Sequence, residues 1–228
     1  MSFPVQTLLI HLACNLFTFL LSCVVLYTNW LSKDRIQTKA YSEGVLWRRL
    51  PLILLNLAIL SLLVLVGLRA ISGYFVLNEY PSALTLIWQV LVILFFDDLY
   101  FYFYHRLLHE NKFLLAKIHS IHHKASTPFP MEYIYVHPLE WLIGSLGPFL
   151  GILALGSVNV YSFWAYIIIR NLHEADIHSG IRSLVFKYVP FVAPAEHHDL
   201  HHSKPFGNYA STFSYLDRLL GTAMKAKS

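Results

Sequence analysis

Three uncharged, apolar runs dominate the first hundred positions of the chain, with short polar stretches between them. They predict membrane-spanning helices over 7–30, 50–68 and 82–100, because a span needs about 20 mostly apolar residues. The third helix is expected to continue beyond the membrane. The aromatic segment that follows Asp97 and Asp98 leads without a break to the first pair of histidines.

A fourth apolar region, 139–172, contains several glycines and one internal proline, Pro148. Two full crossings would need about 40 residues, which is more than this region offers. A proline also disfavours one uninterrupted helix. We therefore predict a helical hairpin of two short or tilted helices over 139–172.

The composition supports this pattern, since 56% of the residues are hydrophobic and only 13% are charged. Soluble domains average about 25% charged residues. The sequence therefore predicts an all-α integral membrane protein of about four transmembrane helices, organised as a single membrane domain over 1–228. Cys14 and Cys23 lie in the first apolar run, which favours membrane-embedded thiols over a disulfide or zinc site. No basic stripe suggests a nucleic-acid partner.

The distribution of positive charge predicts an orientation. Cytoplasmic loops of membrane proteins are enriched in Lys and Arg. If the basic loop 33–49 faces the cytoplasm, every Lys and Arg except Arg69 falls on that side. The same orientation places a cytosolic helical cap, formed by 101–138 and 173–228, on the cytoplasmic face.

Histidine is the residue type with the most informative placement. The chain has 13 histidines, and all but His11 lie between His105 and His202. Three clusters have spacings that put side chains on one helix face: His105-x3-His109, His119-x2-His122-His123 and His198-x2-His201-His202. Neutral imidazole is the commonest protein metal ligand. The repeated His-x2-His-His pattern predicts two comparable half-sites and hence a di-metal site.

Residues near the clusters are weaker candidates. Asp98 lies two helical turns before His105, and Tyr102 lies one turn before it. Both could therefore support that ligand without binding the metal themselves. A carboxylate at Asp98 could accept the second N–H of a ligand imidazole. His11 is isolated in the first span and is interpreted as structural. His197 breaks the spacing of its cluster and is left out of the ligand set.

The three clusters resemble the histidine boxes of the fatty acid hydroxylase / sterol desaturase superfamily of membrane di-iron oxygenases. The segments EYIYVHPLEWLIG (132–144), DIHSG (176–180) and HHDLHH followed by GNYASTFSYLDRLLGT resemble the C-4 sterol methyl oxidase branch more narrowly. The resemblance covers roughly residues 97–222. It implies metal ligands at His105, His109, His119, His122, His123, His178, His198, His201 and His202. His137 and His173 are further candidates, although His173 departs from the pattern of the sterol branch.

The resemblance also implies a reaction. Two iron ions would use O2 to hydroxylate a lipid C–H bond, first of all a C-4 methyl group of a sterol, and purified protein could carry zinc in the same cage. We expect the metals to carry the chemistry, the lipid to enter from the bilayer, and electrons to come from a separate donor such as cytochrome b5 or a ferredoxin-like protein. The expected location is the endoplasmic reticulum in a eukaryote or the inner membrane in a bacterium. Position suggests a substrate tunnel lined by Tyr102, Tyr104, Met131, Tyr133, Trp141 and Trp164.

Two alternatives stay open from the sequence. One is another enzyme of the superfamily, a fatty acyl or other lipid hydroxylase or a desaturase. The other is a metal-binding or metal-transporting membrane protein without catalytic activity. Transport would need polar ligands inside the spans, where the apolar runs contain only His11, Asn15 and Asn56 as candidates.

Overall fold

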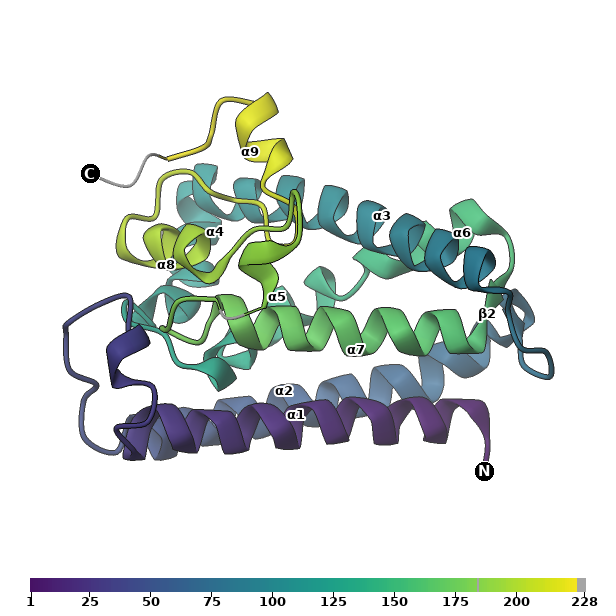
Figure 1. The fold of residues 1–228 in the computed structure, drawn as a ribbon, viewed down its shortest axis with the longest axis horizontal. Coiled ribbons are helices and arrows are strands. Elements are labelled where there is room, and N and C mark those ends of the chain that lie inside the picture. Colours follow the sequence, from purple (N-terminus) through teal and green to yellow (C-terminus); the bar gives the residue numbers. More distant parts are fainter. Residues whose placement is uncertain (184, 225–228) are drawn as a thin grey trace.

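The computed structural model describes residues 1–183 and 185–224, so the last positions of the predicted cap, 225–228, lie outside the described part. Four long helices form the body of the molecule and run side by side (Figure 1). They are α1 (Phe3–Tyr27), α2 (Val45–Ala70), α3 (Ala83–Glu110) and α7 (Val160–Ile177).

Several short elements lie at the two ends of these helices, while α6 packs along α3. α4 and α8 gather at one end of the molecule, and the N-terminus and β2 lie at the other (Figure 1). The short helices are α4 (Lys112–Lys117), α5 (Pro138–Gly144), α6 (Gly147–Leu155), α8 (Ala195–Ser203) and α9 (Tyr215–Leu219). The 3-10 turns are η1 (Ser32–Asp34), η2 (Ser72–Tyr74), η3 (His119–Lys124), η4 (Pro130–Ile134) and η5 (Phe186–Tyr188). Two short strands, β1 (Phe75–Val76) and β2 (Val158–Asn159), pair in parallel.

Within the described residues, 4 helices are long and apolar enough to cross a membrane. They are α1, α2, α3 and the segment Pro138–Leu155, which α5 and α6 form together. Many large apolar side chains on these helices point outward; Leu16 is 60% exposed and Leu62 is 64% exposed. Lipid would cover such faces. The predicted fold class, an all-α membrane protein with a histidine-rich site, is confirmed.

The region predicted as a helical hairpin, 139–172, holds three helices. The chain breaks between α5 and α6 and turns again after Gly156, whose φ of 69° is tolerated best by glycine. α7 then starts at the Asn159 cap, where the side chain accepts a hydrogen bond from the Tyr161 N–H at 3.0 Å. α7 continues past 172 to Ile177 and thereby brings charged residues toward the histidines.

Two glycines one turn apart allow α6 to pack closely on α3. A Cβ atom at Gly151 would lie 2.7 Å from the Ile93 Cα, and one at Gly147 would lie 2.2 Å from the Asp97 Oδ1. Residues four apart share one helix face, and small residues at this spacing let membrane helices approach closely. The contact positions the C-terminal half of α3, which carries the first histidine pair.

Candidate metal centre

Nine histidines converge in two groups, and each offers one ring nitrogen to a shared point. The first group contains His105, His109, His119, His123 and His201. The second contains His122, His178, His198 and His202. Within each group the ligand atoms all lie within 4.8 Å of one another. The structure thus brings together all nine residues of the main predicted ligand set.

The division between the groups is not one histidine box for each half-site, as the repeated spacing suggested. In every box the residues at i and i+4 belong to one group. In the two His-x2-His-His boxes the i+3 residue belongs to the other group. His122 therefore joins the second group although its box supplies the first, and His201 joins the first although its box supplies the second. Each of the two His-x2-His-His boxes therefore contributes histidines to both half-sites.

The distances between ring nitrogens fit a shared cation. The Nε2 atom of His119 lies 2.8 Å from that of His109 and 3.0 Å from that of His123, and the last two are 3.1 Å apart. Each Nε2 carries either one hydrogen or one lone pair, so linear hydrogen bonds cannot satisfy all three contacts. Ligand nitrogens about 2.1 Å from one ion lie about 3 Å apart at right angles. A metal ion accounts for this triangle.

The second group shows the same spacing. Nε2 of His178 lies 3.0 Å from Nε2 of His198 and 3.4 Å from Nε2 of His122. Nε2 of His202 lies 3.1 Å from that of His198. In the first group, the buried Nε2 of His201 has no hydrogen-bond partner in the described part of the chain. An unpaired buried nitrogen is costly, and coordination to a metal would satisfy it.

Burial keeps these imidazoles neutral, which is the form that binds a metal. Burial and the neighbouring rings lower the pKa of His198, His201 and His202 well below the usual range. The same causes lower the pKa of His123, at the edge of the site, to about 3. A proton therefore competes poorly with a metal ion in this cage at neutral pH.

Four of the rings are oriented by acceptors on their second nitrogen. In three cases Nδ1–H donates to a backbone carbonyl: that of His105 to Tyr209 O at 2.8 Å, that of His201 to Gly207 O at 2.8 Å and that of His178 to Glu174 O at 3.0 Å. The fourth acceptor is a carboxylate, Glu140 Oε1, 2.8 Å from Nδ1 of His119. Each contact fixes the tautomer that leaves Nε2 free for a metal. Glu140 was missed by sequence reasoning, although a carboxylate next to a predicted span was a signal for it.

Asp98 does not orient His105, contrary to the sequence-based interpretation. Its Oδ1 accepts from the backbone N–H groups of Thr212 and Phe213 at 2.7 and 3.2 Å. Seven residues span about 10.5 Å of helix, too far for this short side chain to reach the ring. Tyr102 contacts Thr222 at 2.9 Å between their hydroxyl oxygens. Both residues instead hold the segment that follows the last histidine box.

Asp217 organises the same segment. Its carboxylate accepts from Tyr209 N–H at 2.8 Å, from Ala210 N–H at 3.0 Å and from the Thr222 hydroxyl at 2.7 Å. Nε2 of His197 lies 3.0 Å from Oδ2 of Asp217, the oxygen that also accepts from Ala210. Burial opposes ionisation, but these hydrogen bonds outweigh it and lower the pKa of Asp217. The contacts position the Tyr209 carbonyl against His105.

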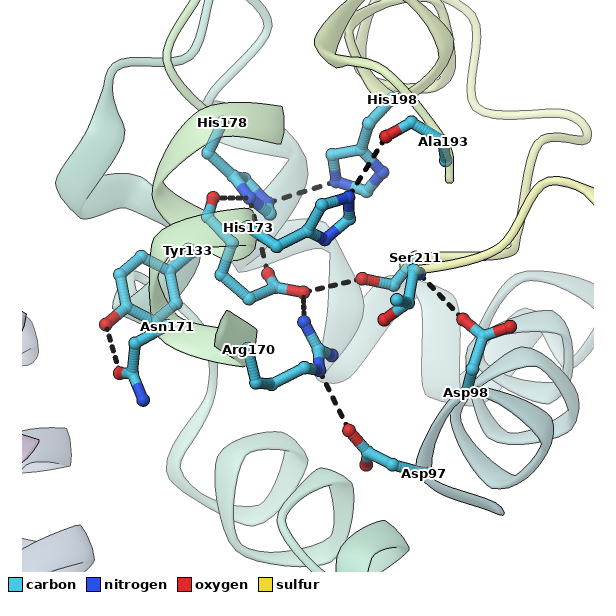
Figure 2. Close-up of polar contacts among 12 residues, drawn as sticks. Asp97, Asp98, Tyr133, Arg170, Asn171, His173, His178, Ala193, His198 and Ser211 are labelled. Atoms are coloured by element: carbon cyan, nitrogen blue, oxygen red, sulfur yellow. Dashed lines mark hydrogen bonds and ion pairs between the residues drawn. The ribbon is translucent and has the colours of Figure 1, made fainter. Parts of the chain in front are cut away.

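The structure does not bring His137 and His173 to either group of nitrogens. His137 caps α5, where its Nδ1 accepts from the Leu139 N–H at 3.1 Å. Nε2 of His173 donates to the Ala193 carbonyl at 3.0 Å (Figure 2). These contacts describe local structural roles, so the tentative assignment of both residues as ligands gains no support.

A cavity opens beside the metal groups and runs between the long helices. It encloses about 1240 Å³ of space outside protein atoms, part of it open to the exterior. Its wall includes His105 and His119 from the first group, as well as His122, His178 and His198 from the second. Of the predicted tunnel residues, Tyr133 and Trp141 line it, while Tyr102, Tyr104, Met131 and Trp164 are not among its lining residues. His11, interpreted as structural, also lines this cavity.

Comparison with known proteins bears on this arrangement. The family model described as fatty acid hydroxylase matches residues 90–222. The chain belongs to this family. It is 34% identical over 223 residues to "Methylsterol monooxygenase 1" of Gallus gallus, a match that covers 95% of the chain and 75% of that protein.

Two other relatives show how far the similarity extends. The chain is 44% identical over 128 residues to "Methylsterol monooxygenase 1" of Rattus norvegicus, covering 55% of the chain and 43% of that protein. It is 35% identical over 147 residues to a "Very-long-chain aldehyde decarbonylase" of Oryza sativa subsp. indica, covering 62% of the chain and 54% of that protein. The chain thus matches about half the length of these two curated relatives. No solved structure matches it significantly.

Proposed function

We propose that the protein is a membrane-bound di-iron oxygenase that hydroxylates a methyl group on C-4 of a sterol. The observation that carries this proposal is the position of the metal groups: histidines from both groups line one largely apolar cavity between the helices. A lipid that enters the cavity meets both half-sites at once. The relatives named methylsterol monooxygenase support a sterol as that lipid.

The chain would hold one iron ion in each group, through His105, His109, His119, His123 and His201 and through His122, His178, His198 and His202. When bound, such ions supply the activation of O2 and the cleavage of an unactivated C–H bond. In the overall reaction, a methyl C–H bond, O2, two electrons and two protons become an alcohol and water. The same nitrogen cage accepts zinc, so zinc in purified protein is compatible with this proposal.

The chain's own residues have three tasks. The neutral imidazoles bind the ions without adding charge to the cavity. Glu140 and the carbonyls of Tyr209, Gly207 and Glu174 keep four of the rings in the ligating tautomer. Apolar lining residues such as Phe101 and Trp141 exclude water from the substrate.

Electrons must come from outside the nitrogen cage. We infer a separate donor of the cytochrome b5 or ferredoxin type, docked on the basic face of the protein. The positive-inside rule makes that face cytoplasmic. The membrane would be the endoplasmic reticulum in a eukaryote or the inner membrane in a bacterium.

The direct test uses purified, iron-loaded protein in nanodiscs with a chemical or protein reductant, ¹⁸O2 and a 4-methylsterol. We expect a hydroxymethyl sterol that carries one ¹⁸O atom, detected by mass spectrometry. Selective oxidation of an added fatty acyl lipid, with the sterol untouched, would identify the protein as an acyl hydroxylase or desaturase. Two bound ions without turnover of any lipid would favour a metal-binding or transporting protein.

A further inference from the structure

An ion-pair network lies in the cavity wall beside the second metal group. Arg170 of α7 lies between two carboxylates: its Nε is 2.8 Å from Asp97 Oδ2, and its Nη1 contacts Glu174 Oε1 (Figure 2). The Tyr166 hydroxyl donates to Asp97 at 3.0 Å, and the Ser211 hydroxyl donates to Glu174 at 2.5 Å. The network therefore connects α3, α7 and the segment after the last histidine box.

The network is next to the metal centre. Oε2 of Glu174 lies 3.4 Å from Nδ1 of His178, whose Nε2 faces the second group. The Arg170 guanidinium thus pairs with the same carboxyl group that contacts His178.

One edge of the guanidinium has no protein partner. Guanidinium groups have five N–H donors, and Nη2 of Arg170 makes no hydrogen bond within the described part of the chain. Of the Arg170 side chain, 14% is exposed although the residue lies inside the molecule, and Arg170 lines the cavity. The ring of Phe101, another lining residue, is 5.8 Å from its central carbon. Arg170 thus has an unpaired donor edge and lies in the wall of the space that the substrate would occupy.

We propose that Arg170 is a polar anchor in the cavity, which binds the hydroxyl oxygen of a neutral lipid alcohol and thereby places the adjacent carbon at the metal centre. The Arg170 guanidinium is already paired with the carboxyl groups of Asp97 and Glu174. A lipid carboxylate would bring a third carboxyl group to one guanidinium, whereas a hydroxyl adds none. This inference rests on the proposed lipid oxidation and specifies its substrate class.

The position of the anchor agrees with a sterol. A sterol carries its hydroxyl on the ring carbon next to C-4, so a hydroxyl held at Arg170 keeps a C-4 methyl group within a few bonds of the anchor. A simple acyl chain has no such group next to an unactivated methylene. The anchor would therefore select the ring system and direct which carbon is oxidised.

The test compares the binding of two ligands to wild-type and to variant protein, each loaded with metal and held in nanodiscs. It measures equilibrium binding of a 4-methylsterol and of the 4-methylsterane that lacks the hydroxyl, by competition with a radiolabelled sterol. Wild-type protein should bind the sterol about tenfold or more tightly, because the sterane leaves a buried donor unpaired. In Arg170→Gln, the two ligands should bind with nearly equal affinity.

A matched control separates binding from folding. Arg49 forms an ion pair of the same kind with Glu132, at 3.0 Å, but does not line the cavity. Arg49→Gln should lower thermal stability and retain the preference for the hydroxyl. If Arg170→Gln does not fold, Arg170→Lys keeps the charge between the carboxylates and should weaken the preference in part.

The outcomes distinguish the two levels of the proposal. If wild-type protein binds and oxidises the sterol but binds the sterane equally well, the anchor is wrong and the sterol function stands. An unchanged preference in folded Arg170→Gln and Arg170→Lys would also overturn the anchor and leave the network a structural ion pair. If wild-type protein binds neither ligand, the proposed function and the anchor fail together.

Discussion

Glu140 Oε1 accepts a hydrogen bond from Nδ1 of His119 at 2.8 Å. The carboxylate comes from α5, in the candidate span Pro138–Leu155, whereas the imidazole comes from the η3 turn. His119 has the shortest nitrogen contacts of the first metal group. A helix of the candidate span thus orients a proposed metal ligand that lies outside it.

Replacing this carboxylate should weaken metal binding without removing a ligand. We expect Glu140→Ala to lower metal affinity by about 10- to 100-fold, the usual cost of losing a partner that orients a ligand. Competition with a chelator measures the affinity. Glu140→Gln keeps an acceptor oxygen and should be milder, so an Ala variant with wild-type affinity would contradict the orienting role.

The unequal size of the two groups predicts unequal sensitivity to ligand loss. His122→Ala leaves three imidazoles in the second group, whereas His201→Ala leaves four in the first. Elemental analysis should therefore show that His122→Ala retains about one ion per chain and His201→Ala retains more. His137→Asn is the control, since asparagine can still cap α5. Equal loss in all three variants would argue against two separate groups.

Asp217 gives the protein a pH-dependent contribution to stability. Its pKa is lowered in the folded state, so the stabilisation is present above the unfolded value of about 3.9 and is lost as pH falls through the folded value. Asp217→Asn should lower the melting temperature at pH 7, and the difference from wild type should shrink below about pH 4. A difference that stays constant across this range would exclude ionisation of Asp217 as the cause.

Close packing of α6 on α3 should be sensitive to one methyl group. Gly151→Ala places a Cβ 2.7 Å from the Ile93 Cα, so the helices must separate at a cost of about 1–3 kcal/mol. Thermal unfolding in detergent measures the loss. Gly73→Ala is the control, because nothing lies within 4 Å of its added Cβ, and its stability should stay within about 0.5 kcal/mol of wild type. Equal melting temperatures for both variants would show that the α3–α6 contact is not tight.

The proposed orientation can be measured with cysteines introduced at two exposed positions. Lys39 lies in the basic loop after α1, and Asn78 lies between β1 and α3. In intact cells or sealed vesicles, an impermeant thiol reagent applied from the cytoplasmic side should label Lys39→Cys and spare Asn78→Cys. The reverse pattern would invert the topology.

The apolar runs and the histidine spacings were sufficient to predict the helical membrane fold and the nine converging histidines. Both depend on local periodicity: helices expose one face every three to four residues, so the sequence shows which side chains point together. Family resemblance added His178, which belongs to no local cluster. Predicting the spans and the histidines of the boxes thus required no knowledge of how the helices pack.

Only the tertiary structure decided how the histidines divide and what surrounds them. His122 and His201 each belong to the group that the other box supplies. This assignment depends on how η3 and α8 face each other, which the histidine spacing within each element does not specify. The pairing of His119 with Glu140, the anchoring role of Asp98 and the place of Arg170 in the cavity wall are contacts between segments far apart in sequence. Periodicity describes one helix at a time, whereas contacts between elements depend on how close their backbones pack, and here glycines set that approach between α3 and α6.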